Sequence, residues 1–140
     1  MSKGKYLAFS MAKTMALVMA LAMALAMVSD SAFAGDPKKG KKVFKKCKIC
    51  HAVTLKDKRK RMGPNLIGVV GRKAGTAPGF KRYVGLKGVD FVWDDARLDE
   101  YLTDPKKFIK KIGGKKSKMV LKTKKASQRA DVIAYLKTLK

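Results

Sequence analysis

The apolar positions of this chain form one long unbroken run, several short helical patterns and a stretch interrupted by glycine. The unbroken run, residues 15–28, reads MALVMALAMALAMV and carries no charge. Between residues 63 and 90, seven glycines and two prolines separate the apolar side chains, which predicts turns and loops. No segment alternates apolar and polar residues over the length of a strand. The pattern therefore predicts a fold made mostly of helices and loops.

Three residue pairs that begin with aspartate mark expected helix starts. Asp36-Pro37 and Asp104-Pro105 each place a capping carboxylate before a proline, and Asp94-Asp95 puts acidic charge at a helix N-terminus. Gly113-Gly114 predicts the end of the helix that runs from residue 105 through Ile112. Ser127 is the expected cap of a last helix. The apolar positions of that last helix are Val132, Ile133, Tyr135, Leu136 and Leu139.

Residues 1–34 have the three parts of a secretory signal peptide. Lys3, Lys5 and Lys13 form a basic head before the apolar run, and residues 32–34 form an A-x-A cleavage site after it. The run is shorter than the roughly 18 to 20 residues that span a bilayer, which argues against a retained membrane anchor. We therefore expect export, cleavage after Ala34 and one domain over residues 35–140.

Charge sets a limit on how this domain is stabilised. The 140 residues contain 34 Lys+Arg and 10 Asp+Glu, a formal net charge of +24. Residues 1–34 hold three of the lysines and one aspartate, so residues 35–140 keep 31 basic and 9 acidic side chains, a formal +22. A chain of 106 residues builds a modest core, and self-repulsion works against compactness. We expect a group other than the side chains to help fill the interior.

The two cysteines and the single histidine stand together as Cys47-Lys48-Ile49-Cys50-His51. By chance, such an arrangement arises in about one case in ten thousand, so composition does not account for it. C-x-x-C-H is the attachment signature of c-type haem. The two thiols add across the two vinyl groups of the haem, and the next residue lies beneath the iron, where an imidazole can bind it.

Three other interpretations account for less of this cluster. A thiol–disulfide redox site usually follows a strand, whereas residues 38–44 have no strand pattern. A zinc site needs four ligands, and the chain has three Cys and His in total. A structural disulfide is common in exported proteins but leaves the adjacent histidine unexplained. Haem attachment is therefore the favoured interpretation.

With these motifs together, residues 35–140 resemble a class I cytochrome c of the mitochondrial and bacterial periplasmic carrier type. The resemblance implies an all-α fold, a single small domain of several helices and glycine-rich loops around one covalently bound haem c. The segments that carry it, in chain order, are GKKVF at 40–44, CKICH at 47–51, GPNL at 63–66, GRKAG at 71–75, APGF at 77–80, Trp93, DPKKF at 104–108, Lys118-Met119 and ADVIAYL at 130–136.

The resemblance implies His51 and Met119 as iron ligands on opposite faces of the haem. The carbonyl of Pro64 would accept the other imidazole N–H and orient His51. Met62 is the only other methionine in residues 35–140, and it stands beside the GPNL turn, which packs on the histidine side. The resemblance assigns the two thioether bonds to Cys47 and Cys50.

Further positions match residues that surround the haem. Arg72 and Trp93 match donors to a buried propionate, a carboxylate that is costly to bury without hydrogen bonds. Tyr101 matches a tyrosine beside the methionine ligand. The family's tyrosine two places after the APGF phenylalanine is replaced here by Arg82 followed by Tyr83, so either side chain is a candidate for contact with a propionate.

The stretch from Phe108 to Met119 departs from the mitochondrial pattern. It is about five residues longer and lacks the proline before the ligand, as in the longer bacterial carriers. The resemblance assigns no role to residues 110–118.

An iron with both axial positions filled by protein has no open position for a substrate, which favours electron transfer. The resemblance implies a monomeric periplasmic carrier of single electrons that does not insert into the membrane. Its partners would be membrane complexes with acidic docking faces (a cytochrome bc complex, a terminal oxidase or a photosynthetic reaction centre) or a periplasmic dehydrogenase. The lysines that match the family's docking ring are Lys46, Lys106, Lys107, Lys118, Lys124 and Lys125.

Two other classes of function remain as alternatives. A haem enzyme or sensor would act when the Met119 ligand detaches and admits peroxide or a gas. A basic binder of nucleic acid or anionic lipid is suggested by charge alone. Export and the haem motif both argue against that last class.

Overall fold

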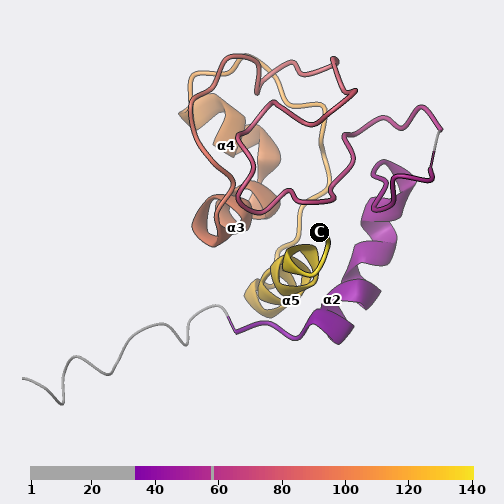
Figure 1. Cartoon of the computed structure of the whole chain (residues 1–140). Helices are drawn as coiled ribbons and strands as arrows, with labels where there is room; N and C mark the ends of the chain where they lie inside the picture. Colours follow the sequence, from indigo (N-terminus) through magenta and orange to yellow (C-terminus); the bar gives the residue numbers. More distant parts are fainter. Residues whose placement is uncertain (1–33, 58) are drawn as a thin grey trace, which may run out of the picture. The chain divides into compact units, whose positions relative to one another are not determined.

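The computed structural model describes residues 34–140 with the exception of residue 58. The predicted signal peptide, residues 1–34, lies outside the described residues apart from Ala34. The described helices are α2 (Pro37–Val43), the 3₁₀ helix η1 (Phe44–Ile49), α3 (Asp95–Thr103), α4 (Pro105–Lys111) and α5 (Ala126–Lys137) (Figure 1).

Loops connect η1 to α3 over residues 50–94, and the isolated bridge between Lys73 and Val92 is the one β pairing among the described residues. None of the described helices is long and apolar enough to cross a membrane. The prediction of an all-α domain with a glycine-rich loop region is confirmed.

Aspartates begin three of the helices, as the sequence predicts. Asp36 accepts hydrogen bonds from the N–H groups of Lys38 and Lys39 at 2.8 and 3.3 Å. Asp94 accepts one from the Arg97 N–H at 2.7 Å. Each carboxylate satisfies backbone donors that have no partner inside the helix.

Asp104 both ends α3 and caps α4. Its backbone N–H donates to the Glu100 carbonyl at 3.3 Å, and its side chain accepts from the N–H groups of Lys106 and Lys107. A single residue therefore satisfies backbone groups at the end of α3 and at the start of α4.

The prediction that Ser127 caps the last helix is wrong. α5 begins at Ala126, its N-cap is Lys125, and the cap makes no side-chain hydrogen bond. The start is set instead by Arg129, whose guanidinium donates to the carbonyls of Thr123 and Lys124 at 3.1 and 2.8 Å and thereby holds the chain that enters the helix.

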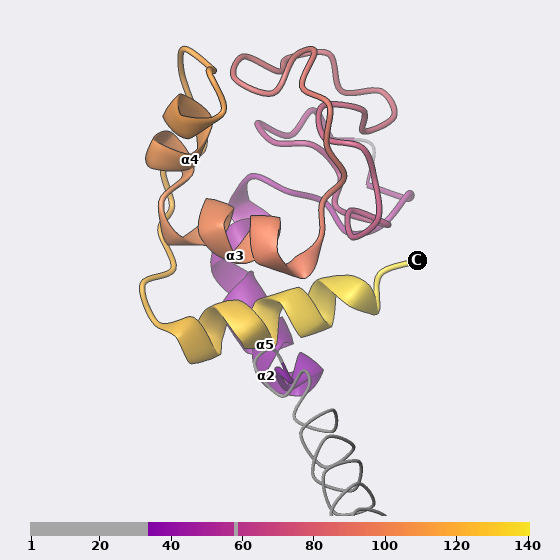
Figure 2. The same cartoon turned by 90° about the vertical axis from the view of Figure 1, so that its left-hand side faces the viewer.

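α2 and α5 pack against each other although they lie at opposite ends of the described chain (Figure 2). Gly40 is buried at the contact, and the rings of Phe44 and Tyr135 lie 5.3 Å apart between centroids. The backbone N–H of Asp36 donates to the carboxylate of Asp131 at 2.8 Å. This contact closes the domain.

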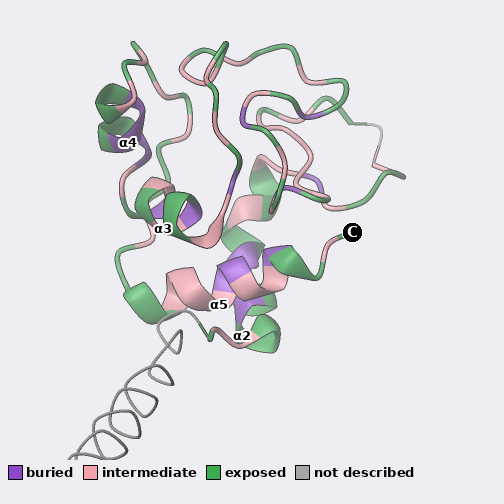
Figure 3. Ribbon diagram, turned by 60° about the vertical axis from the view of Figure 1, so that its left-hand side comes forward, coloured by how far each residue is buried: buried purple, intermediate pink, exposed green. Residues whose placement is uncertain are grey.

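The buried side chains come from η1, α3, α4, α5 and the loops, whereas the one buried residue of α2 is Gly40 (Figure 3). Phe44 of η1, Leu98 of α3, Phe108 of α4 and Ile133 of α5 are each 5% exposed or less, and Trp93 from the preceding loop is 6% exposed. These side chains hold η1 and the segment before α5 in place. A cavity lies between these two segments.

Gly40 should not tolerate a side chain. A Cβ at this position would lie 2.6 Å from the Asp131 carbonyl carbon and 2.8 Å from the Tyr135 Cβ. We expect Gly40→Ala to destabilise the protein by about 1–3 kcal/mol because α2 and α5 must separate. Lys41→Ala, one residue along on the exposed side of α2, is the control. Equal denaturation midpoints for the two variants would contradict the prediction.

Candidate functional site

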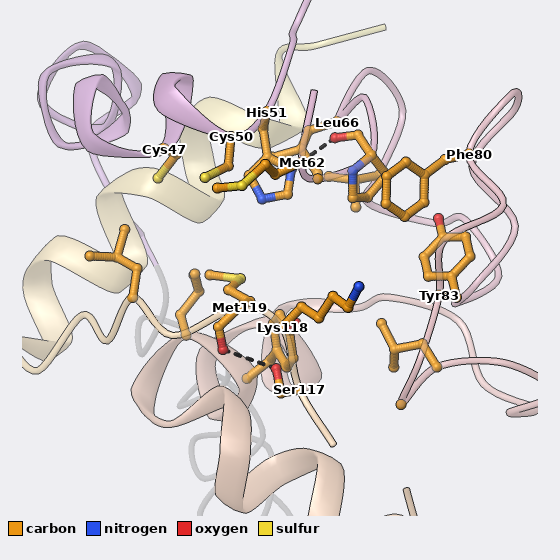
Figure 4. A pocket seen from close by; sticks show the side chains of 18 of the residues that line it. Cys47, Cys50, His51, Met62, Leu66, Phe80, Tyr83, Ser117, Lys118 and Met119 are labelled. Atoms are coloured by element: carbon orange, nitrogen blue, oxygen red, sulfur yellow. Dashed lines mark hydrogen bonds between the residues drawn. The ribbon is translucent and has the colours of Figure 1, made fainter. Parts of the chain in front are cut away.

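A cavity of about 770 Å³ opens among η1, the loops and the segment that precedes α5 (Figure 4). This volume lies in the range of cofactor sites, roughly 300–1,000 Å³. Its lining is mainly apolar and includes Leu66, Val69, Leu98 and Leu102. The cavity is therefore suited to a large apolar group of the size of a cofactor.

One wall carries both cysteines and the histidine, as the sequence predicts. The N–H groups of Cys50 and His51 both donate to the Cys47 carbonyl, at 3.1 and 2.9 Å, so the chain makes a tight turn. This turn presents the two sulfurs and the imidazole to the same cavity. The thiols are not bonded to each other. Burial and the neighbouring Cys50 raise the pKa of the Cys47 thiol.

The His51 ring is oriented by the loop that follows. Its Nδ1 lies 2.8 Å from the Pro64 carbonyl oxygen, and because that oxygen only accepts, Nδ1 is assigned the proton. Nε2 is then left with a lone pair for a metal. Burial lowers the pKa of His51, which favours the neutral imidazole that binds metals.

Met119 lies on the opposite wall. In Figure 4 its sulfur faces the cavity across from His51, whereas Met62 lies on the histidine side. Met62 is 71% exposed. The Ser117 hydroxyl donates to the Met119 carbonyl at 2.9 Å, which fixes the backbone at that position. Tyr101 lines the same cavity, and burial raises the pKa of its phenol.

The far end of the cavity carries polar side chains. The guanidinium of Arg72 donates to the carbonyls of Ile67 and Asn65 at 2.8 and 3.0 Å, which holds it at the wall. The Tyr83 hydroxyl accepts from the Ala77 N–H at 3.0 Å, so its own O–H remains free to donate.

Trp93 and Arg82 also line the cavity. Arg82 is exposed, and its guanidinium donates to the carbonyl of Arg61. Of the two candidates left open by the sequence, Tyr83 is the more enclosed.

These features together fit a haem. The cavity offers a pair of thiols, an imidazole with a free Nε2, a thioether on the facing wall, apolar sides and donors at one end. A haem presents two vinyl groups, an iron with two axial positions, an apolar macrocycle and acidic propionates, which match that set of groups.

The extended loop packs against the loop at residue 85. A Cβ on Gly114 would lie 2.7 Å from the Gly85 carbonyl oxygen and 2.7 Å from the Ile109 Cγ2, so both backbones approach closely. Lys116 and Ser117 from this loop line the cavity. Residues 110–118 therefore help to enclose the side that carries Met119.

Five of the six predicted docking lysines lie at hollows of the surface. Lys46, Lys106 and Lys118 line the large cavity. Lys46 also lines a second hollow of about 310 Å³, together with Lys124 and Lys125. Lys107 is exposed but lines neither hollow. Apolar side chains lie among these lysines at the large cavity: Ile49, Met62 and Val120 line it and are 66–75% exposed.

Reasoning from sequence missed a charged cluster beside the cysteine turn. Asp57 pairs with Arg59 and Arg61, and Arg61 reaches the carbonyls of Lys48 and Ile49. By composition alone, residues 52–62 are a basic loop. The signal was the one acidic residue in that stretch, four positions before an arginine.

Comparisons with known proteins agree with this geometry. The model of the family described as "Cytochrome c" matches residues 37–140. Cytochrome c2 of Rhodobacter capsulatus is 45% identical over 114 residues, which cover 75% of this chain and 83% of the relative. Cytochrome c-550 of Paracoccus pantotrophus is 43% identical over 113 residues, with 73% and 84% covered.

Solved structures are similar over the same part of the chain. Cytochrome c2 from Rhodospirillum centenum superposes with a TM-score of 0.67 at 39% identity and covers 75% of this chain and 98% of its own. Ferric cytochrome c-550 from Paracoccus versutus gives 0.63 at 44% identity, with 75% and 98% covered.

Proposed function

The chain belongs to the cytochrome c family, carries haem c and acts as an electron carrier, not an enzyme, and we propose from this premise how its own residues hold the haem and meet a partner. The observation that carries the proposal is that His51 and Met119 face each other across one apolar cavity whose wall also holds both cysteines.

Cys47 and Cys50 would hold the haem through thioether bonds, and His51 Nε2 and the Met119 sulfur would ligate its iron. The bound haem supplies a one-electron redox centre, and methionine ligation favours a relatively high potential. The protein contributes the fixed position of both ligands. Pro64 holds the imidazole tautomer, and the bond from Ser117 holds the Met119 backbone.

Arg72, Tyr83 and Trp93 contact the haem propionates, and Tyr101 packs beside the methionine ligand. The guanidinium of Arg72 is already held by two backbone carbonyls, which lowers the cost of ordering it around a carboxylate. Burial lowers the pKa of Arg72, but a guanidinium stays charged in proteins.

Electron partners dock at the mouth of the cavity, through Lys46, Lys106 and Lys118 with Lys107, Lys124 and Lys125 farther out. Exposed Ile49, Met62 and Val120 lie among these cations and form an apolar centre for the contact. The partner is a redox complex with a matching acidic face, either membrane-bound or a dehydrogenase. We propose that the chain meets it in the periplasm as a monomer, after export and removal of residues 1–34.

Covalent attachment predicts that haem stays with the chain after unfolding. Wild-type protein should keep haem staining through denaturing electrophoresis. Cys47→Ser with Cys50→Ser should lose it, because no thioether bond can form. Met62→Leu, which leaves both thiols in place, is the control. Haem that leaves the denatured wild-type chain would contradict the assignment.

Ligation is tested with the two methionines. Met119→Ala should abolish the far-red absorption of the methionine–iron bond and lower the reduction potential, because the thioether ligand is gone. Met62→Leu should leave both nearly unchanged, since Met62 lies on the histidine side. The opposite result would assign the ligand to Met62. Retention of the band in both variants would mean that Met62 can take the place of Met119 as the ligand, and that the assignment to Met119 alone is wrong.

Docking is tested by the salt dependence of the electron-transfer rate to an acidic partner. Changing Lys46, Lys106 or Lys118 to Gln should slow the reaction several-fold at low salt and flatten its salt dependence, because each lysine meets partner charge within a Debye length of roughly 8–10 Å. Lys39→Gln and Lys56→Gln remove the same charge from exposed positions that do not line the cavity. Equal effects from both sets would mean that net charge alone steers the reaction.

A further inference from the structure

Three hydrogen bonds join residues 50–52 to residues 63–66 on the histidine side of the cavity. The Gly63 N–H donates to the Cys50 carbonyl at 2.9 Å, and the His51 Nδ1–H donates to the Pro64 carbonyl at 2.8 Å. The Leu66 N–H donates to the Ala52 carbonyl at 2.9 Å. The position of the His51 ring therefore depends on where residues 63–66 lie.

Arg61 extends this pairing to the end of η1. Its Nη1 donates to the Lys48 carbonyl at 2.7 Å and also lies 3.4 Å from the Ile49 carbonyl oxygen. Carbonyls in the last turn of a helix have no partner within the helix. The Arg61 guanidinium satisfies these carbonyls directly before the cysteine and histidine ligands.

Asp57 holds the guanidinium in this position. Its Oδ2 accepts from Nε and Nη2 of Arg61 at 3.2 and 2.7 Å, so all three guanidinium nitrogens are engaged. The side chains of Asp57 and Arg61 are 8% and 19% exposed. Hydrogen bonds from Arg59 and Arg61 hold the pKa of Asp57 well below its usual range. The pair is therefore charged and fixed, unlike a mobile surface ion pair.

We propose that Arg61, held by Asp57, is a positioning residue for the His51 side of the haem site. It anchors the start of the 61–66 segment, and Gly63 and Pro64 then meet Cys50 and His51 at bonding distance. Residue 63 packs closely against the His51 ring, because a Cβ on Gly63 would lie 2.6 Å from His51 Nδ1. Without the anchor, the bond from His51 Nδ1 to Pro64 should open more often, and the imidazole should become a weaker donor to iron.

Arg59 provides a matched control. It bonds the same carboxylate, Asp57, at 2.8 Å and carries the same charge. Its side chain is 74% exposed, and no bond joins it to the cysteine turn among the described residues. Arg59→Ala therefore removes the charge without removing the anchor.

The experiment compares Arg61→Ala and Arg59→Ala in the haem-loaded protein. Hydrogen exchange followed by NMR at the Gly63 amide and the His51 Nδ1 proton should be about tenfold faster in the first variant, a change of about 1.4 kcal/mol in opening free energy. Both protons should stay within about twofold of wild type in the second. The amide of Ile133 in α5 reports global unfolding and should exchange as in wild type in both.

The reduction potential gives a second measurement. Both variants lose one positive charge, but only Arg61→Ala weakens the imidazole bond, so its potential should lie above that of Arg59→Ala. Arg61→Lys should recover part of the protection, since an ammonium can bond one carbonyl but lacks the fork geometry. Asp57→Asn should speed exchange at Gly63 by a smaller factor, and it tests the anchor if Arg61→Ala does not fold.

Equal exchange and equal potentials in Arg61→Ala and Arg59→Ala would overturn the proposal, as would faster exchange that is the same at Ile133. The proposal rests on His51 being the iron ligand. A wild-type protein without bound haem, or without a histidine-ligated spectrum, would refute that proposed function. A normal wild-type spectrum with no difference between Arg61→Ala and Arg59→Ala would refute only the role of Arg61 as an anchor.

Discussion

Two side chains far apart in the sequence, His51 and Met119, must face each other across a gap wide enough for one haem. Neither local helix formation nor a collapsed apolar core produces such a gap, because close packing removes hollows. The chain keeps the walls apart by closing the domain elsewhere, at the contact between α2 and α5 where Gly40 lets the helices touch. The apolar surface that lines the cavity is then covered by the haem, which adds the burial that a small charged domain otherwise lacks.

Hydrogen bonds to backbone carbonyls, more than apolar packing, fix the loops that carry the site. The Pro64 carbonyl accepts a hydrogen bond from the His51 N–H, and the Met119 carbonyl accepts one from the Ser117 hydroxyl. The guanidinium of Arg72 donates to two carbonyls of its own loop. Loops lack the repeating bonds of helices, so side-chain donors take that role. The Arg61 anchor belongs to the same pattern and extends it to the turn that holds the cysteines.

The distribution of acids explains why the basic charge is available to partners. Each of the nine Asp and Glu side chains of residues 35–140 accepts a hydrogen bond or forms an ion pair inside the domain. Six of the nine lie between residues 90 and 104. None of these ion pairs involves Lys46, Lys106 or Lys118. The lysines at the cavity mouth therefore have no ion-pair partner among the described residues, which leaves their charge available to the acidic partner that we propose.

The sequence by itself determined what depends on neighbouring residues. The haem attachment chemistry lies within Cys47–His51, and the helix starts at Asp36, Asp94 and Asp104 depend on donors two or three residues away. The assignment of Met119 over Met62 needed the resemblance to a family as well, because spacing alone does not say which wall a methionine reaches.

Only the tertiary structure decided what depends on contacts between distant segments. Ser127 has the right residue type for a cap, but the cap of α5 is Lys125, two residues earlier, where bonds from Arg129 hold the chain upstream. The bond from Arg61 to Lys48 crosses 13 positions, and although Asp57 four residues before Arg61 indicates an ion pair, the sequence does not say which carbonyls the guanidinium reaches. Such contacts form only after the loops have been brought together, and the free energy that holds them comes from the whole domain, so no local pattern encodes them.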